Sequence, residues 1–414
     1  MKNKKRFSCS STFFTISILL SPGHVYSGEF SGYVGGQTRN FFEEPLNSEQ
    51  HNNYLSVVAE PEYSHQWDDG SQSVDMKLFY RVDQYDNHRT HGDIREMSWT
   101  GVFEKGLLKD WEILAGISKV FWGVTETDHL VDIINQTDLV ENVDGEDKLG
   151  QPMLRASTER DWGTLSLFIL PIFRDRTFPG AQGRPRTSVI IDTGHDAIYD
   201  SSAGKNHIDY AARYSNYGDV WEFGLSFFSG TGRSPTDLSP IGVKSTGEPI
   251  VLPVYSLINQ LGFDGQAFFG DWTWKLEAIV TEIRSGEKKG IDSFQTVGGF
   301  ERTLVGVADS AMDLGFVVEY HYSDNNVIDS IFDNDLSTAL RFVLNDAQST
   351  EVLAGITTDG NTSTMGSFIE ASRRLGASWT LEAQVRAFHN TKENRPLYSF
   401  RFDNFAQVDL NYNF

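Results

Sequence analysis

The sequence predicts an all-β fold, a closed antiparallel transmembrane β-barrel of about 18 strands. Three observations predict it: apolar and polar residues alternate over runs of membrane-spanning length, short and long connections alternate along the chain, and most tryptophans lie beside the short connections. A barrel of 16 strands stays open as an alternative, because the segments near residues 350 and 365 are short and weakly patterned.

The alternation is clearest in residues 73–83, 272–280, 311–322 and 379–387. In the first run, the even positions are apolar and the odd positions are mostly charged, with Phe79 as the exception. Soluble β-sandwiches alternate in the same way, so length decides between the two. These runs reach 9 to 12 residues, enough for a tilted strand to cross a bilayer, whereas strands average about 5–6 residues in globular proteins.

The connections support the same architecture. The strands are expected to begin near residues 29, 53, 73, 94, 111, 151, 164, 207, 220, 255, 272, 293, 311, 336, 350, 365, 378 and 398. Connections after even-numbered strands are mostly tight turns, whereas three connections after odd-numbered strands are long: 123–150, 174–206 and 230–254. Short periplasmic turns and long extracellular loops are typical of even-stranded barrels. Seven of the nine tryptophans lie beside the short turns, as a ring at one membrane interface would require: Trp67, Trp111, Trp162, Trp221, Trp272, Trp274 and Trp379.

Residues 1–27 have the layout of a signal peptide. A basic stretch ending at Arg6 precedes a short apolar run, residues 13–20, and cleavage is expected before Gly28. A retained anchor would need about 20 apolar residues. Cleavage would leave residues 28–414 as the barrel and remove Cys9, the single cysteine, so we expect neither a disulfide nor a thiolate site.

The charge balance excludes one class of partner. The chain has 57 acidic and 35 basic residues, a formal net charge of −22, which argues against binding a nucleic-acid backbone. Acidic groups suit a surface that meets the divalent cations bridging lipopolysaccharide, although a role in solubility explains the number equally well.

The carboxyl end adds a resemblance. Apolar residues alternate from Val408 to a terminal Phe414, and this pattern resembles the last strand of bacterial outer-membrane proteins. The resemblance implies integration in the outer membrane, recognition of Phe414 by the barrel-insertion machinery, and contact with outer-membrane lipid and lipopolysaccharide. A homo-oligomer is possible, and the sequence does not decide between monomer and trimer.

The polar faces of the strands should line an aqueous lumen, because 18 strands enclose more space than side chains fill. Rings of mixed charge could orient polar solutes, although charged residues also face water simply because water is there. The lumen-lining candidates are Asp75, Lys77, Arg81, Glu112, Arg155, Glu159, Arg213, Glu222, Asp264, Lys275, Glu277, Asp313, Glu319, Arg341, Glu370, Glu382, Arg386 and Arg401.

The connection 123–150 is the predicted specificity element. It is more apolar than a freely solvated loop, so we expect it to fold into or over the lumen, with an exposed loop helix as the alternative. Its acidic residues would make a constriction favour cations. The constriction candidates are Glu126, Asp128, His129, Asp132, Asn135, Asp138 and Glu141. Residues 140–151 place Gly145 like a calcium-loop glycine, but Val140 and Gln151 fail the end positions, so no metal site is predicted.

Short motifs carry a second resemblance. Trp122-Gly123 followed by residues 132–138 is similar to a motif of an uncharacterised family of proteobacterial outer-membrane barrels. Residues 332–335, Arg341 and Asn345-Asp346 add to it. The resemblance implies barrel architecture and a porin-like role, and it supplies no substrate.

The function expected from these observations is passive diffusion of small polar solutes with a weak cation preference and no cofactor. The alternatives are a specific exporter or transporter of a polysaccharide or a hydrophobic compound and, as a weaker one, an outer-membrane hydrolase. His321-Tyr322-Ser323 is the single His-x-Ser arrangement, and it falls on the lumen face with Glu319, the wrong side for a lipid substrate. No Gly-x-Ser-x-Gly or His-Glu-x-x-His motif is present. No catalytic residue is therefore predicted.

Overall fold

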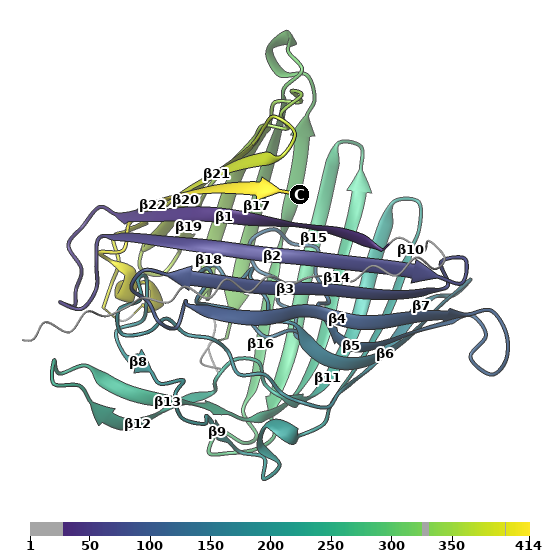
Figure 1. Ribbon diagram of the computed structural model, residues 1–414, viewed down its shortest axis with the longest axis horizontal. Helices are drawn as coiled ribbons and strands as arrows, with labels where there is room; N and C mark the ends of the chain where they lie inside the picture. Colours follow the sequence, from purple (N-terminus) through teal and green to yellow (C-terminus); the bar gives the residue numbers. More distant parts are fainter. Residues whose placement is uncertain (1–27, 325–330, 394) are drawn as a thin grey trace, which may run out of the picture.

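A computed structural model describes residues 28–324, 331–393 and 395–414. The predicted signal peptide, 1–27, lies outside the described residues. Eighteen strands form one antiparallel sheet that closes on itself (Figure 1). Closure is explicit in the register: β1 (Glu29–Phe41) pairs with β2 (Asn53–Trp67) on one edge and with β22 (Phe405–Asn413) on the other. The predicted barrel is therefore confirmed with 18 strands, and the alternative of 16 is wrong.

The remaining strands of the wall each pair with their neighbours along the chain. The first group comprises β3 (Gln72–Asp83), β4 (His91–Phe103), β5 (Trp111–Ser118), β6 (Gln151–Arg160), β7 (Gly163–Leu170), β10 (Asp209–Tyr217) and β11 (Trp221–Thr231). The second comprises β14 (Leu257–Phe269), β15 (Trp272–Ile283), β16 (Asp292–Leu304), β17 (Asp313–Ser323), β18 (Asn334–Val343), β19 (Glu351–Asp359), β20 (Met365–Leu375) and β21 (Trp379–His389). Most of these strands begin within three residues of the predicted positions.

The last strand is the exception. It was expected near residue 398 but begins at Phe405, because residues 396–400 form the 3₁₀ helix η3 (Pro396–Phe400). Pro396 at the first helical position favours this turn. Arg401 ends the helix in the β21–β22 connection, so its assignment to a lumen-facing strand is wrong. Two other 3₁₀ turns, η1 (Gly204–Asn206) and η2 (Val307–Asp309), are equally short. Among the described residues, no helix is long and apolar enough to cross a membrane.

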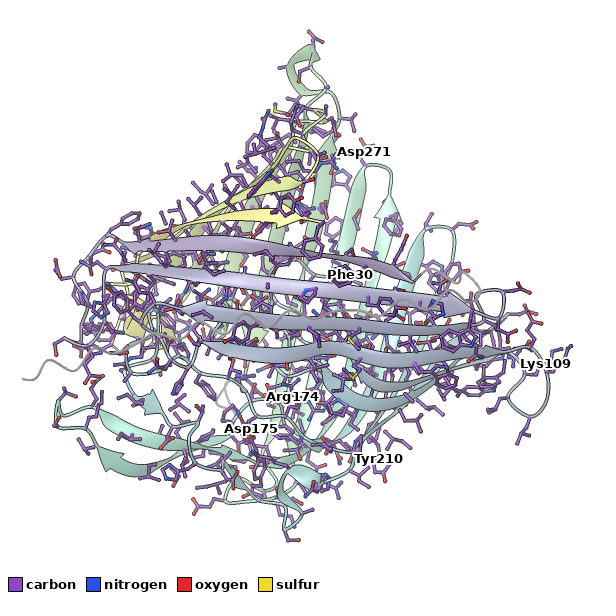
Figure 2. The ribbon with its side chains drawn as sticks, viewed as in Figure 1. Phe30, Lys109, Arg174, Asp175, Tyr210 and Asp271 are labelled. Atoms are coloured by element: carbon purple, nitrogen blue, oxygen red, sulfur yellow. The ribbon has the colours of Figure 1, made fainter. Side chains whose placement is uncertain are left out.

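The two faces of the wall differ as the alternation predicts. On β15, Trp274, Leu276 and Val280 point outward and are 45–49% exposed, whereas Glu277 and Ile283 point inward and are fully buried. The outer face carries similar exposed apolar residues around the barrel, including Phe30 and Tyr210 (Figure 2). A sheet with its apolar side outside and its polar side inside needs an apolar medium around it.

Tryptophans mark the end of the barrel where connections are short. β5, β11, β15 and β21 each begin with a tryptophan, β2 ends with one, and Trp162 lies in the turn between β6 and β7. The predicted ring position is therefore confirmed. We call this the short-turn end and the opposite one the long-loop end.

A β-bulge on β4 changes which side chains face inward. The β3–β4 register shifts after Lys77, which leaves Arg95 as the extra residue of β4. Its guanidinium turns inward and lies 4.4 Å from the ring centroid of Phe79. Phe79, which breaks the alternation in the sequence, is thus an inward-facing aromatic that packs under a cation.

A small second sheet lies at the long-loop end (Figure 1). Strand β13 (Pro249–Tyr255) pairs antiparallel with β12 (Asp237–Val243) and parallel with β8 (Ile190–Ile191) and β9 (Ile198–Tyr199). The β7–β10 and β11–β14 connections are therefore joined to each other through this sheet. Ion pairs Lys244–Glu49 and Arg186–Glu248 link this sheet to neighbouring loops.

The pairing of β1 with β22, which closes the barrel, can be tested by a disulfide. Gln37 and Asp409 are register partners across β1 and β22, so the double variant Gln37→Cys/Asp409→Cys should form a cross-link that denaturing electrophoresis detects and a reductant reverses. The control pair is Gln37→Cys/Glu382→Cys. Its second cysteine lies one strand further, about 10 Å away, beyond the reach of a disulfide. Equal cross-linking of both pairs, or of neither, would contradict the closed register.

Candidate functional site: a loop folded into the barrel

The β5–β6 connection, residues 119–150, is the candidate site, and we call it the inner loop. It consists of turns and two isolated bridges and contains no helix, so the alternative of an exposed loop helix is wrong. One side is apolar: Val131 and Ile134, both fully buried, pack in one cluster with inward-facing Leu114, Phe168 and Ile279. The inner loop is therefore attached to the wall on the side formed by β5, β7 and β15.

Glu277 on β15 is the first polar anchor of the inner loop. One carboxylate oxygen accepts the backbone N–H groups of Val124 and Thr125 at 2.7 and 3.0 Å and the Thr125 hydroxyl at 2.6 Å. The other oxygen accepts the N–H of Val131 at 3.2 Å. A loop inside a barrel has no sheet partners for its backbone, so a wall carboxylate supplies the acceptors.

Glu319 on β17 is the second anchor. Its two oxygens accept the N–H groups of Glu126 and Thr127 at 2.8 and 3.0 Å, and the Thr127 hydroxyl at 2.5 Å. Both anchors are at most 1% exposed. Together they fix residues 124–131 against two strands that are far from β5 and β6 in the chain.

Glu126 extends this attachment through charge. Its carboxylate accepts a hydrogen bond from Lys275 at 2.5 Å and one from Arg341 at 2.8 Å. Burial acts to raise the pKa of Glu126, but the hydrogen bond and charge of Lys275, with those of Arg341, outweigh it and hold the pKa below its usual value. The predicted constriction residue is thus an ionised bridge between β15 and β18.

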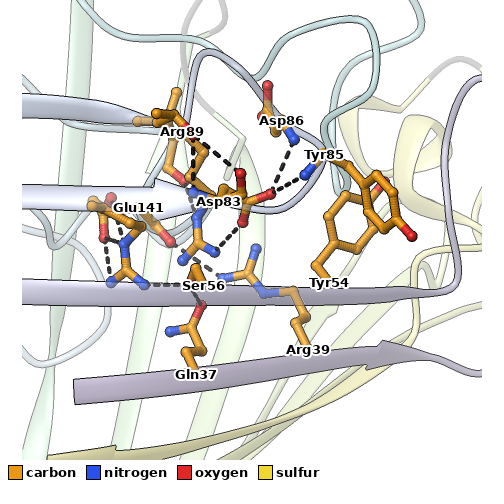
Figure 3. Close-up of polar contacts among 12 residues, drawn as sticks. Gln37, Arg39, Tyr54, Ser56, Asp83, Tyr85, Asp86, Arg89 and Glu141 are labelled. Carbon is orange, nitrogen blue, oxygen red and sulfur yellow. Dashed lines mark hydrogen bonds and ion pairs between the residues drawn. The ribbon is translucent and has the colours of Figure 1, made fainter. Parts of the chain in front are cut away.

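Asp138 and Glu141 connect the inner loop to the opposite wall. Asp138 accepts hydrogen bonds from Arg95 and Thr177, both at 2.6 Å. Burial acts to raise the pKa of Asp138, yet the hydrogen bond from His91 and the charge of Arg95 lower it to about 2. Glu141 pairs with Arg81 of β3 at 2.8 Å (Figure 3). These carboxylates are therefore neutralised directly by wall arginines.

The other constriction candidates stabilise the inner loop itself. Asn135 accepts the N–H of Val120 at 2.8 Å and donates to the carbonyls of Ser118, at the end of β5, and of Leu149. Asp132 lies 3.4 Å from Lys148, and His129 lies 3.4 Å from Glu146. Asp128 is enclosed, and burial with the nearby Glu277 carboxylate raises its pKa to about 7.

The tip of the inner loop is its most open part. The Glu146 side chain is 54% exposed and Asp147 is exposed, although both lie within the ring of strands. Asp144 beside them accepts a hydrogen bond from Arg386 on β21 at 2.6 Å, and Arg386 also donates to Glu370 at 2.8 Å. Because these exposed side chains lie inside the ring of strands, they indicate water-accessible space between the tip and the wall around β20 and β21.

Surrounding protein shifts the titration of the tip. Water reaches the Asp147 side chain, but the enclosing wall reduces the hydration of its carboxylate. This reduced hydration is the main reason that the pKa of Asp147 rises to about 7, and the carboxylates of Glu141 and Asp144 add to it. Burial also acts to raise the pKa of Glu146, but the hydrogen bond from His129 outweighs it and keeps the pKa low. Of these two tip carboxylates, that of Glu146 is therefore ionised at neutral pH and that of Asp147 titrates near neutrality.

The predicted lumen residues occupy the inner face of the wall, Arg401 excepted. Most are paired: Lys77 with Glu62 at 2.6 Å, Arg155 with Glu112 at 2.5 Å, Arg213 with Asp264 at 2.6 Å, Glu222 with Gln266, Asp313 with Asn345 at 2.9 Å, and Asp75 with Ser64 at 2.7 Å. Glu382 lies opposite Asp409 in the register, and Glu159 lies exposed near the short-turn end. Their part in solute passage stays a prediction.

Sequence reasoning missed two wall arginines that contact the inner loop. Arg39 lies on the polar face of β1 with Gln37 and is 4% exposed, so the alternation of β1 could have revealed it. Arg95 is the bulge residue, and strict period-two alternation gives it no defined face. No pattern in the sequence indicates a bulge there.

His321 belongs to the single His-x-Ser arrangement that the sequence offered for catalysis. Its Nε2 atom lies 2.9 Å from the Thr127 hydroxyl and 3.1 Å from the Ser337 hydroxyl, inside the barrel. Within the part of the chain that the structure describes, Nδ1 has no hydrogen-bond partner, so no carboxylate orients the ring as a base. The described ranges also contain no group of three or more His, Cys, Asp or Glu residues that could hold a metal ion.

The comparisons with known proteins find distant structural neighbours. No family model and no curated protein matches the chain. Among solved structures, a triple mutant of the porin of Rhodopseudomonas blastica is 10% identical, with a TM-score of 0.43, and another variant of the same porin is 12% identical, with a TM-score of 0.44. Each alignment covers 94% of this chain and 100% of the other. The strand register itself defines the protein as a large closed β-barrel.

The two anchors can be tested together. In the variant Glu277→Gln/Glu319→Gln, amide groups would meet the N–H donors of the inner loop, so we expect the free energy of unfolding to fall by about 1–3 kcal/mol per site. Urea unfolding in detergent measures this loss. Glu222→Gln, at the exposed short-turn end, is the control and should change little. Equal stability of all three proteins would show that the carboxylates do not hold the inner loop.

Proposed function

We propose that the protein is a porin-like channel for passive diffusion of small polar solutes across a bacterial outer membrane, with a weak preference for cations. The observation that carries the proposal is the exposed acidic tip of the inner loop, Glu146 and Asp147, inside a closed ring of 18 strands. A ring of this size is too wide for wall side chains to fill. A folded-in loop that narrows the interior without sealing it leaves a restricted aqueous passage.

The outer face supports the membrane setting. Apolar side chains around the barrel are exposed, among them Leu261, Ile369 and Val408, and tryptophans lie at the short-turn end. The terminal Phe414 is 44% exposed, and its ring lies 5.5 Å from that of Phe30. We propose that lipid and lipopolysaccharide cover the apolar face and that the insertion machinery recognises this terminal ring.

The charges beside the passage favour cations. Three carboxylates, those of Asp144, Glu146 and Asp147, cluster at the tip, and Glu370 faces them from β20. Arg386 is the basic group between them, and its charge is offset by Asp144 and Glu370. Most other charges of the interior are paired and cancel at a distance. The net field along the passage is therefore negative, which lowers the energy of a cation there.

Planar-bilayer recording tests the proposal. Purified protein should insert with stepwise conductance, and the reversal potential in a potassium chloride gradient should show cations favoured. Glu146→Gln should lower the cation-to-anion permeability ratio by about twofold, because it removes one carboxylate beside the passage. Asp271→Asn, in the exposed turn between β14 and β15, should leave the ratio unchanged. Silent bilayers or a marked anion preference would overturn the proposal.

The selectivity should depend on pH near neutrality. Asp147 has a pKa of about 7, so its carboxyl group is charged above that pH and neutral below it. Cation preference should therefore be greatest at about pH 8 and should decline as the pH falls through 7 to 6. In the variant Asp147→Asn, the cation preference should stay at its low, acid-side value across this pH range. Reversal potentials measured from pH 8 to 6 provide the check, and a preference that rises with acidity would contradict the assignment.

A further inference from the structure

Three buried guanidinium groups lie together where the inner loop meets β1 and β3: those of Arg39 and Arg89, both labelled in Figure 3, and that of Arg81. We call these three residues the arginine cluster. All three residues are 4–6% exposed. Arg81 pairs with Glu141 at 2.8 Å and Arg89 with Asp83 at 3.2 Å. The cluster thus has two direct carboxylate partners for three cations.

Arg39 is the cation without a carboxylate. Its guanidinium donates to neutral oxygens: the Gln407 side chain at 2.7 Å and the carbonyls of Glu141 and Arg184 at 3.2 and 3.4 Å. No carboxylate of the described chain lies within 4.0 Å of it. A buried cation in this position is costly unless an anion balances it.

Arg89 supplies a second, independent sign of a missing partner. Its Nε atom donates to the Val140 carbonyl at 2.9 Å and Nη1 to Asp83, but Nη2 is buried with no hydrogen-bond partner among the described residues. Burial is the main reason that the pKa of Arg89 is lowered, and the charge of Arg81 adds to this effect. One strong donor in the cluster is therefore unsatisfied.

A small cavity adjoins these groups. Arg39 and Arg89 line it together with Arg184, which is 4% exposed and pairs with Asp403 at 2.6 Å. Apolar residues of the inner loop and of the β7–β10 connection, such as Val140 and Pro185, close it. The space is small and holds about one small particle, so it excludes any larger solute.

The carboxylates that border the cavity are already supplied with donors. Asp83 accepts the N–H groups of Tyr85 and Asp86, both at 3.0 Å, in addition to Arg89. Asp86 accepts the N–H of His88 at 3.0 Å and that of Gly180 at 3.2 Å. The group that is short of a partner is thus a cationic donor, so the occupant must accept hydrogen bonds.

We propose that this cavity binds a single halide-sized anion, chloride under ordinary conditions, between the guanidinium groups of Arg39 and Arg89. The anion would give Arg39 a direct counter-ion and would satisfy Arg89 Nη2. It would also hold the inner loop and the β7–β10 connection against β1. This role is structural and does not depend on whether the barrel conducts solutes.

Diffraction on crystals of the full barrel grown in sodium chloride identifies the occupant. At a wavelength where chlorine scatters anomalously, a peak should appear within hydrogen-bonding distance of Arg39 and Arg89. Ordinary density without an anomalous signal would mean a water molecule, and an empty cavity would mean no ligand. Either result would overturn the proposal.

Thermal unfolding in detergent gives a second measurement that needs no crystal. The Tm should be higher by about 2 °C or more in chloride than in gluconate at equal ionic strength, because an anion that binds only the folded state stabilises it. Arg89→Gln should remove this difference. Arg160→Gln, at an exposed ion pair with Asp110 on the short-turn end, should keep it. Equal Tm values in both salts for the unaltered protein would also overturn the proposal.

Discussion

The backbone of the sheet has to find every hydrogen-bond partner within the protein, and the other features of this barrel depend on that constraint. Hydrocarbon offers no donor or acceptor, so the ring closes through β1 and β22. Closure with 18 strands fixes a width that wall side chains cannot fill. The interior therefore receives a loop, and the loop brings its own backbone groups, which need partners in turn.

The inner loop meets that need with side chains instead of a sheet. Glu277 and Glu319 take up the N–H groups of its first half, and Asn135 crosslinks the ends of the loop near β5 and β6. Arginines of β3 and β4 pair with the carboxylates of its second half. An amphipathic loop results, with an apolar side on the β5–β15 wall and an acidic side toward β20 and β21. The open space lies where the acidic tip is exposed.

Periodicity in the sequence was sufficient to predict the wall, because one face of every strand meets an apolar medium and the other does not. The strand positions, the tryptophan ring and the placement of most lumen residues follow from that single asymmetry. Two local departures do not follow from it. The bulge at Arg95 depends on register between two strands, and the helix η3 replaces an extended segment that still looks alternating in sequence.

Partners inside the lumen could not be predicted in the same way. The acidic residues of the inner loop suggested a free constriction charge, but Asp138 and Glu141 are bound to Arg95 and Arg81. The partners could not be predicted because they are distant in the sequence. Periodicity indicates which face of the sheet a residue occupies, but it does not indicate which residue it meets across the interior of the barrel. Glu146 and Asp147 at the tip have fewer partners, so they resemble most closely the free charges that the sequence suggested.

The inner loop also bears on the order in which the molecule is assembled. It is synthesised between β5 and β6. The arginines that hold its second half precede it on β3 and β4, but the groups that hold residues 124–131 and the tip belong to β15, β17, β18 and β21, more than a hundred residues later in the chain. Contacts of such separation form slowly, because long segments must be ordered before the contacts can form. During biogenesis, residues 124–131 and the tip therefore lack these partners until the second half of the wall is in place. Until then, the growing sheet has neither a closed edge nor a packed interior.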